Sequence, residues 1–272
     1  MKFALGHLPP LTLAALRFTF ALLPAVLFLK RPAAWGALAA YGLLIGVGQF
    51  GTIYIAMDGW ISPGLASLVV QVQAFFTIGL SMLLTGERVR GYQIAALALA
   101  AAGLGWLMLH TNSEVTPLGL ILVLTAALGW AGGNIVSRRV GQVNMVAFVV
   151  WSSLFAAPAL FALAFFMEGP AAITAGIRQA DAATWAAVLW QSVGNSLFGY
   201  AAWAWLLARH PAATISPLSL LVPVFGMGAS AIFLREALTS WKLTAAVLVL
   251  SGLAINSLWP MLERRRAAAL AE

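Results

Sequence analysis

The chain alternates between long apolar runs and short polar breaks, a pattern that predicts membrane-spanning helices. A spanning α-helix needs about 20 mostly apolar residues to cross a hydrocarbon core about 30 Å thick. Nine runs meet this requirement: 9–29, 35–57, 63–85, 91–109, 117–136, 145–167, 184–207, 213–235 and 240–260. The longest connection, 168–183, is predicted to be a loop. We therefore expect an all-α membrane protein without a separate soluble domain.

Two of these runs resemble each other closely. Residues 64–87 and 213–236 share an early serine, a phenylalanine, small residues and a closing acid, and Glu236 follows Glu87 by 149 residues. At the same shift the next runs also correspond, in the pairs Ala96 with Ala245, Leu99 with Leu248, Gly103 with Gly252 and Leu104 with Leu253. Self-similarity at a fixed spacing indicates an internal repeat.

Basic residues in the connections predict the orientation of the chain. Ten of them fall on one side of the membrane and four (Lys2, Arg178, Arg235 and Lys242) on the other; the ten are Lys30, Arg31, Arg88, Arg90, Arg138, Arg139, Arg209, Arg264, Arg265 and Arg266. Because positive loops stay in the cytoplasm, the C-terminus is expected inside. Glu87 then lies inside and Glu236 outside, so the repeats are inverted, as in many secondary transporters.

Inversion requires an odd number of helices in each repeat. The second half supplies five helices from Pro117, but the first supplies four and a stub. We expect an inverted five-plus-five repeat with nine helices visible and the first helix of the first repeat missing or truncated. Residues 1–112 would form the first repeat and 113–272 the second, inverted repeat, within one transmembrane domain.

Composition supports a protein that faces lipid. The 272 residues are 62% hydrophobic and 8% charged, whereas about a quarter of an average soluble domain is charged. The net charge of +7 is spread over short clusters between apolar runs, which favours orientation in a membrane over nucleic-acid binding. The sequence contains no cysteine, and its three histidines lie at predicted helix ends, so we expect neither a metal site nor a cofactor.

Arg17 is the charged residue that lies deepest in a predicted helix, about 12 Å past Pro9 at 1.5 Å per residue. A guanidinium at this depth suits a substrate carboxylate. The alternative is a structural arginine that binds backbone carbonyls or reaches outward to the interface.

Uncharged polar residues in the middle of helices are further candidates for a substrate site: Gln49, Gln71, Gln73, Asn134, Gln191 and Asn195. Deep aromatic residues add an apolar wall, namely Tyr54, Trp130, Tyr200 and Trp203. Pro217 and Pro223 would kink a helix and act as hinges. For the polar residues the alternative is hydrogen bonding between helices, and for the aromatics it is ordinary packing.

Several ordered motifs together resemble the EamA-type exporters of the drug/metabolite transporter superfamily. They are PPLTLAALRF at 9–18, LLTGE at 83–87, FLRE at 233–236, GWAGGNIVSRR at 129–139, and the glycines Gly103 and Gly252. The resemblance covers nearly the whole chain and is closest to exporters of aromatic and neutral amino acids. It implies a ten-helix inverted fold in the inner membrane, with a cavity lined by residues near 35–57, 63–85, 117–136, 184–207 and 213–235.

The expected function is export of small, amino acid-like metabolites by alternating access, as a monomer or weak homodimer. No Asp or Glu lies in the middle of a predicted helix, so we expect facilitated export driven by the substrate gradient and not by protons. A drug or other metabolite exporter and a non-transporting scaffold subunit are the alternatives. An enzyme is not expected, because no nucleophile–base pair lies at depth, and a channel is disfavoured by the absence of a charged ring.

Overall fold

The computed structural model describes residues 2–85, 90–110, 114–199, 202, 206 and 221–269. The helices of the first half are η1 (Ala4–Gly6), α1 (Pro10–Leu22), η2 (Ala25–Leu27), α2 (Trp35–Gly42), η3 (Leu43–Gly51), α3 (Thr52–Met57), α4 (Pro63–Val69), η4 (Val70–Val72), α5 (Gln73–Thr85) and α6 (Gly91–Leu109). Those of the second half are α7 (Pro117–Val140), α8 (Met145–Met167), α9 (Gly169–Gln179), α10 (Ala182–Leu189), η5 (Trp190–Phe198), α13 (Leu221–Leu234) and α14 (Ser240–Ala269). The segments η3 and η5 are π-helices.

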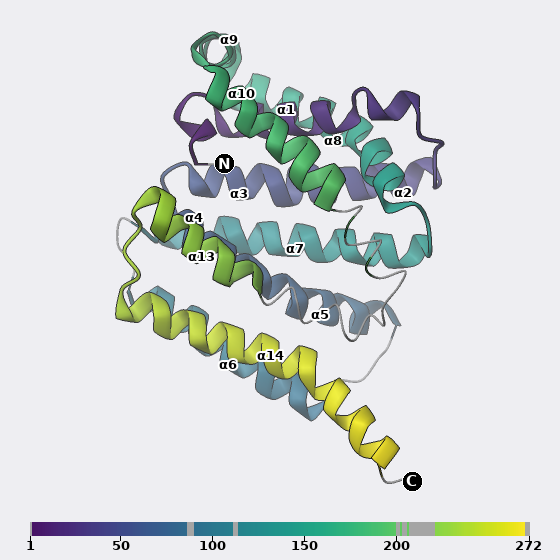
Figure 1. Cartoon of the computed structure of the whole chain (residues 1–272), viewed down its shortest axis with the longest axis vertical. Helices are drawn as coiled ribbons and strands as arrows, with labels where there is room; N and C mark the ends of the chain where they lie inside the picture. The colour runs from purple at the N-terminus through teal and green to yellow at the C-terminus, as the bar shows by residue number, and fades with distance from the viewer. Residues whose placement is uncertain are drawn as a thin grey trace.

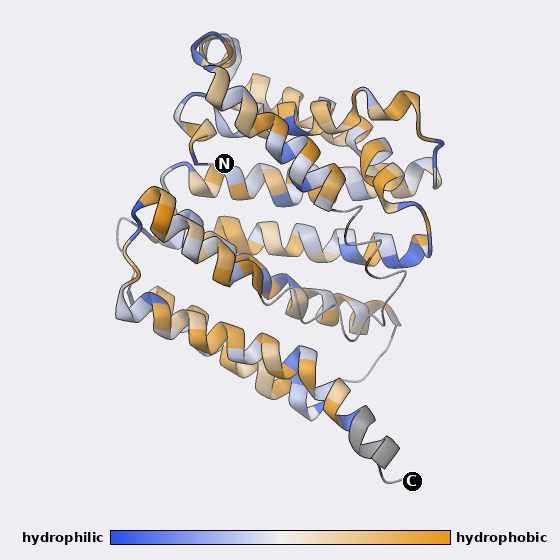
Figure 2. Ribbon diagram, in the orientation of Figure 1, coloured by the Kyte–Doolittle hydropathy of each residue, from blue (hydrophilic) through white to orange (hydrophobic). Residues whose placement is uncertain are grey.

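Seven helical segments in the described ranges are long and apolar enough to cross a membrane. Figure 1 shows the helices side by side, stacked along the long axis of the molecule, with the N-terminus at the left and the C-terminus at the right. Apolar residues cover most of their length, and polar residues gather near the helix ends (Figure 2). The chain is therefore an all-α, multi-pass membrane protein, as its hydropathy predicts. The predicted helices 184–207 and 213–235 are described only in part.

Several helices begin where the sequence carries residues suited to a helix N-terminus. Pro10, Pro63 and Pro117 each occupy the first turn of a helix, where the missing N–H of proline leaves no bond unmade. Asn144 caps α8 by accepting a hydrogen bond from the N–H of Ala147 at 3.0 Å.

Several predicted helix boundaries are wrong. The first helix was expected to reach residue 29, but α1 ends at Leu22 because Pro24 cannot continue the hydrogen-bonded ladder. The last helix continues nine residues beyond the predicted end, to Ala269, since the arginine- and alanine-rich tail is a good helix former.

The segment 168–183 is not a loop, because most of it forms α9. This short helix begins with a proline in its first turn and buries Gly176. A β-carbon at Gly176 would lie 2.8 Å from Pro9 and 2.9 Å from the carbonyl oxygen of His7, so α9 packs closely on the chain entering α1.

Helices α6 and α14, one from each predicted repeat, pack against each other, antiparallel, at one end of the molecule (Figure 1). A β-carbon at Gly103 would lie 3.2 Å from the carbonyl oxygen of Ala245, and one at Gly252 would lie 2.5 Å from that of Ala96. Ala96 and Ala245 correspond in the predicted repeat, as do Gly103 and Gly252. The contact between the two helices is therefore reciprocal.

Candidate functional site

Arg17 occupies the centre of a polar cluster in which both halves of the chain meet. It lies in the middle of α1 with 1% of its surface exposed. Its Nε and one Nη donate hydrogen bonds to the hydroxyl of Ser196 in η5 at 3.2 and 3.0 Å, and the other Nη donates to the hydroxyl of Tyr54 in α3 at 3.0 Å. The guanidinium lies over the ring of Phe50, 3.7 Å from its centroid. Arg17 therefore does not reach the interface, and the hydrogen bonds described for its side chain go to hydroxyl groups.

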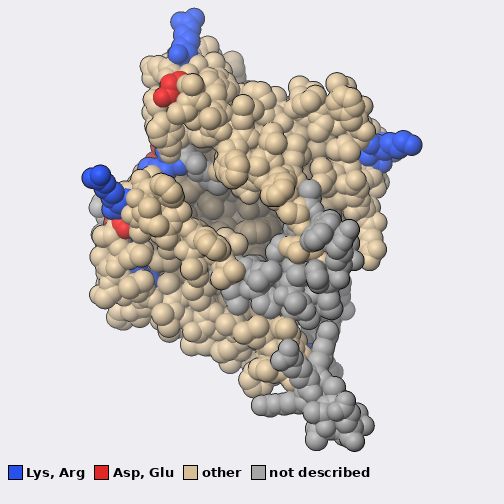
Figure 3. Space-filling view, in the orientation of Figure 1, with Lys and Arg blue, Asp and Glu red and all other residues tan. Residues whose placement is uncertain are grey.

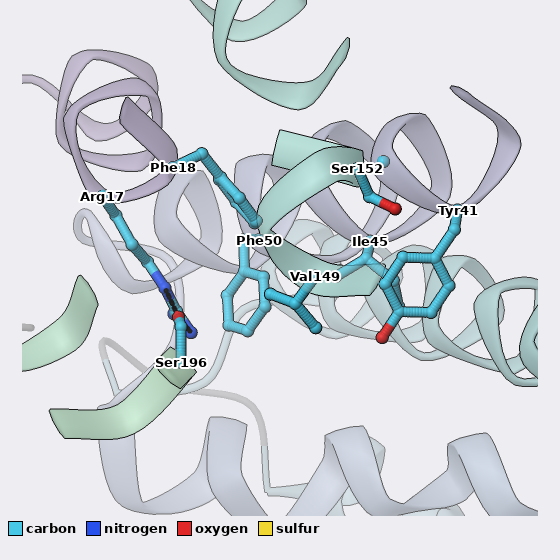
Figure 4. A pocket seen from close by; sticks show the side chains of 9 residues that line it. Arg17, Phe18, Tyr41, Ile45, Phe50, Val149, Ser152 and Ser196 are labelled. Carbon is cyan, nitrogen blue, oxygen red and sulfur yellow. Dashed lines mark hydrogen bonds between the residues drawn. The ribbon is translucent and has the colours of Figure 1, made fainter. Parts of the chain in front are cut away.

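A small cavity of about 10 Å³ adjoins this cluster, room for about one water molecule. Figure 4 shows its lining side chains, which come from α1, α2, η3, α8 and η5: Arg17, Phe18, Tyr41, Ile45, Phe50, Val149, Ser152 and Ser196. The hydroxyl of Ser152 is buried and has no hydrogen-bond partner among the described residues. The site thus combines a cation, free polar capacity and aromatic walls.

The charge of Arg17 is not balanced by an acid in the described part of the chain. The ion pairs found there join Arg90 to Glu263, and Lys242 to Glu114 and Glu236. A buried charge without a counter-ion is unfavourable in a low-dielectric interior. An anion that entered this site would relieve that penalty.

A second polar cluster joins α5 and α7. The side-chain amide of Asn134 donates hydrogen bonds to Gln73 at 2.9 Å and to Thr77 at 3.2 Å, and Arg138, one turn further, donates to Ser81 at 3.3 Å. On another side, α7 packs closely on η3, where a β-carbon at Gly129 would lie 2.7 Å from the backbone. Asn134 and Gln73, predicted as substrate-binding residues, thus make in this structure the interhelical hydrogen bond that was the alternative for them.

Gln191 and Asn195 share one face of η5, as their spacing predicts. The side-chain amide of Asn195 donates to Gln191 at 2.9 Å, and Asn195 is exposed. The face of the molecule that is turned to the viewer in Figure 3 has a hollow at its centre. In Figure 1, which has the same orientation, this hollow lies between α10 and α13.

The remaining candidates are dispersed. Gln49 and Gln71 are buried in η3 and η4, and the side-chain oxygen of Gln49 accepts no hydrogen bond from the described residues. Trp130 is half-buried and packs against the apolar core, and Pro223 is buried in the first turn described for α13. Tyr200, Trp203 and Pro217 lie outside the described residues.

An ion-pair cluster joins the two halves of the chain where α4 and α14 begin. Glu236 accepts hydrogen bonds from the Ser62 hydroxyl and the Gly64 N–H at the start of α4. The fully buried Lys242 lies 3.1 Å from Glu236 and 3.0 Å from Glu114. Burial alone would raise the pKa of Glu236, but the bonds from Ser62, Lys242 and Gly64 together hold it below its ordinary value.

Sequence reasoning missed Ser152 and Ser196 in the Arg17 cluster. Serine is common at helix–helix contacts, so neither residue differs from a packing residue in the sequence. Ser196 also lies in a π-helix, whose wider turn is not visible in a pattern based on 3.6 residues per turn. Among the described residues, no group of three or more histidines or acids is placed to hold a metal.

Comparison with known proteins identifies the family to which the chain is similar. The model of the EamA-like transporter family matches residues 1–109 and 117–258. The chain is 37% identical over 263 residues to a protein of Salmonella typhimurium named "Probable amino-acid metabolite efflux pump", covering 94% of this chain and 88% of that protein. An Escherichia coli K12 protein of the same name is 37% identical over 265 residues, with the same two coverages.

The fold is also shared with a solved structure. A crystal structure superimposes with a TM-score of 0.64 at 22% sequence identity, over 96% of this chain and 91% of that one. At this identity the likeness shows the fold alone. The family match spans nearly the whole chain, and the described helices have the length and composition of membrane spans. The chain therefore belongs to the EamA-like transporter family and is a membrane transporter, not an enzyme.

Proposed function

We propose that this transporter exports amino acid-like metabolites, with aromatic and neutral amino acids as the leading substrates. The named function of the two bacterial relatives, amino-acid metabolite efflux, supports export of this class. Transport would proceed by alternating access, with residues 1–112 and 113–272 as the two inverted repeats that move against each other around a central site.

The observation that carries this proposal is the buried guanidinium of Arg17, whose hydrogen bonds go to neutral hydroxyls and not to an acid. Arginine binds carboxylates through two parallel N–H groups, so an α-carboxylate is a fitting ligand. Phe50 and Tyr54 lie beside it, and an apolar or aromatic substrate side chain would pack against such rings.

Most of the other predicted site residues would complete the binding surface: Gln49, Gln71, Trp130, Gln191, Asn195, Tyr200 and Trp203. Their amides and rings provide the few polar contacts in an otherwise apolar cavity that fix the orientation of a small ligand. Gln73 and Asn134, which bond to each other between α5 and α7, would hold those two helices together. Pro217 and Pro223 would serve as hinges. The transporter would lie in the inner membrane with its C-terminus in the cytoplasm, consistent with the loop charges.

Counterflow into proteoliposomes tests the proposal. Vesicles that contain the protein and unlabelled amino acids should accumulate labelled phenylalanine, tryptophan or threonine, and Arg17→Gln should abolish the accumulation. Arg90→Gln is the matched control, because Arg90 is an exposed arginine in a surface ion pair. If the folded protein carried only drugs or metabolites without a carboxylate, the amino acid assignment would be wrong.

The same vesicles test the energy source. We propose facilitated export, so an imposed pH gradient should leave the transport rate unchanged while an amino acid gradient drives it. A rate that follows the pH gradient would contradict gradient-driven export and would require a proton-carrying group.

A further inference from the structure

The contact between Arg17 and Ser196 differs from an ordinary interhelical hydrogen bond in its geometry. The Nε–H and one Nη–H of Arg17 both point at the single hydroxyl oxygen of Ser196, at 3.2 and 3.0 Å. Side by side, two such N–H groups are also what a carboxylate engages in bidentate pairing. In this structure the serine hydroxyl therefore occupies the place that a carboxylate would take.

The same contact holds η5 in place. Of the nine residues of η5, the buried ones are Ser192 and Ser196, whereas Trp190, Val193 and Phe198 are exposed. Ser192 donates its hydroxyl to the carbonyl of Val188, one turn back on its own helix. Ser196 likewise donates its hydroxyl to its own helix, to the carbonyl of Gln191 at 3.1 Å, but it also accepts from Arg17. Within the described residues, Ser196 is therefore the side chain that joins η5 to α1 by hydrogen bonds.

We propose that Arg17 and Ser196 form a lock between the two repeats that a substrate carboxylate opens. This rests on the proposed function, since it assumes that the ligand carries a carboxylate. A carboxylate would bring an opposite charge and two acceptor oxygens to the guanidinium, one for each N–H, whereas the Ser196 hydroxyl offers both N–H groups a single neutral oxygen. The substrate therefore displaces Ser196, and η5 is released from α1 only when the carrier is loaded. Tyr54 and Phe50 hold the guanidinium in position during the exchange of partners.

Such a lock has a kinetic consequence. An empty carrier that stays locked changes conformation slowly, so exchange of substrate for substrate is faster than net efflux into substrate-free medium. Breaking the lock while leaving Arg17 intact should accelerate the empty carrier. It should also strengthen substrate binding, because the internal competitor for the guanidinium is gone.

Ser196→Ala tests the lock, with Ser192→Ala as the control for loss of a buried serine from the same helix. In proteoliposomes, Ser196→Ala should raise the ratio of net efflux to exchange by about three- to ten-fold and lower the apparent Kd for phenylalanine by a similar factor. Ser192→Ala should change neither. Equal behaviour of the two variants would overturn the lock, as would loss of exchange by a folded Ser196→Ala protein, which would make Ser196 a substrate ligand.

A measurement without substrate separates this proposal from the proposed function. Hydrogen–deuterium exchange of the η5 amides should be about three- to ten-fold faster in Ser196→Ala than in Ser192→Ala, in detergent and without amino acids. Unchanged exchange would refute the lock whatever the protein carries. If hydrogen–deuterium exchange were faster in Ser196→Ala but the parent protein transported no amino acid, the proposed substrate class would be refuted. The hydrogen bonds between Arg17 and Ser196 would still be shown to hold η5 in place.

Discussion

Gly252 on α14 packs against the carbonyl oxygen of Ala96 on α6 so closely that an added β-carbon would lie 2.5 Å from that oxygen. The corresponding contact of Gly103 with Ala245 makes the interface between the two helices reciprocal. In a bilayer, such close approach of backbones is a main source of helix association, since lipid removes the hydrophobic drive.

Gly252→Ala should therefore destabilise the protein by about 1–3 kcal/mol, because the neighbouring atom is backbone and cannot move aside. Gly105→Ala is the matched control, since a β-carbon there meets nothing within 4 Å and alanine favours the helix. Unfolding in detergent, followed by circular dichroism, should show a loss for the first variant and no loss for the second. Equal stability of both would contradict the observed packing.

The ion-pair cluster around Glu236 should make stability depend on pH. Its carboxyl has a lowered pKa in the folded protein, so its contribution is present above the pKa of the unfolded chain and disappears as the pH falls through the folded value. Glu236→Gln should cost about 1–3 kcal/mol of stability near pH 7, and the difference from the parent protein should shrink in acid.

Glu263→Gln provides the comparison for that prediction. Glu263 pairs with Arg90 across 3.4 Å on the surface, and exposed pairs contribute about 0–1 kcal/mol. A pH-independent difference between the parent and Glu236→Gln would show that the carboxylate charge does not stabilise the junction of α4, α13 and α14.

Substitutions in the pairs Asn134–Gln73 and Gln191–Asn195 should distinguish a structural role from a binding role. Asn134→Leu removes bonds between α5 and α7 and should cost about 0.6–2 kcal/mol of stability. Gln191→Leu affects a pair on the exposed face of η5. It should leave the unfolding transition nearly unchanged but lower counterflow about ten-fold, if that face contacts substrate. Full counterflow by Gln191→Leu would remove Gln191 and Asn195 from the proposed site.

Phe50→Leu should remove the cation–π contact that holds the Arg17 guanidinium in position. The guanidinium lies 3.7 Å from the ring centroid in a desolvated site, where a cation–π contact contributes about 2 kcal/mol. We expect lower thermal stability and a weakened preference for carboxylates, whereas Phe165→Leu, which alters an exposed ring, should change neither. A stable variant with unaltered selectivity would show that the ring does not position the arginine.

Most of the helices could be predicted from the sequence, because spans in lipid need long apolar runs. The two copies of the predicted repeat keep the same small residues. Gly103 and Gly252 were recognised in this way. The end of α1 at Leu22 was not predicted, although Pro24 is a signal in the sequence that a helix ends. The amphipathic α9 was missed because it is too short and too polar to resemble a span.

Prediction of the site was limited by partners far apart in the chain. Arg17 stood out because a charge in an apolar helix is costly, whereas Ser196, 179 residues away, carries no such signal. Asn134 and Gln73 were identified as polar residues at depth, but their bonding to each other depends on how α5 and α7 pack. Periodicity also does not reveal that η3 and η5 are π-helices.

The most direct test of the central claim compares a substrate with its decarboxylated analogue. Calorimetric titration of the purified parent protein should show phenylalanine binding about 10- to 100-fold more tightly than phenethylamine, as a charge-assisted bond at Arg17 requires. In Arg17→Gln, the two ligands should bind with similar affinity. Equal binding of both by the parent, or an undiminished preference in Arg17→Gln, would contradict Arg17 as the carboxylate anchor.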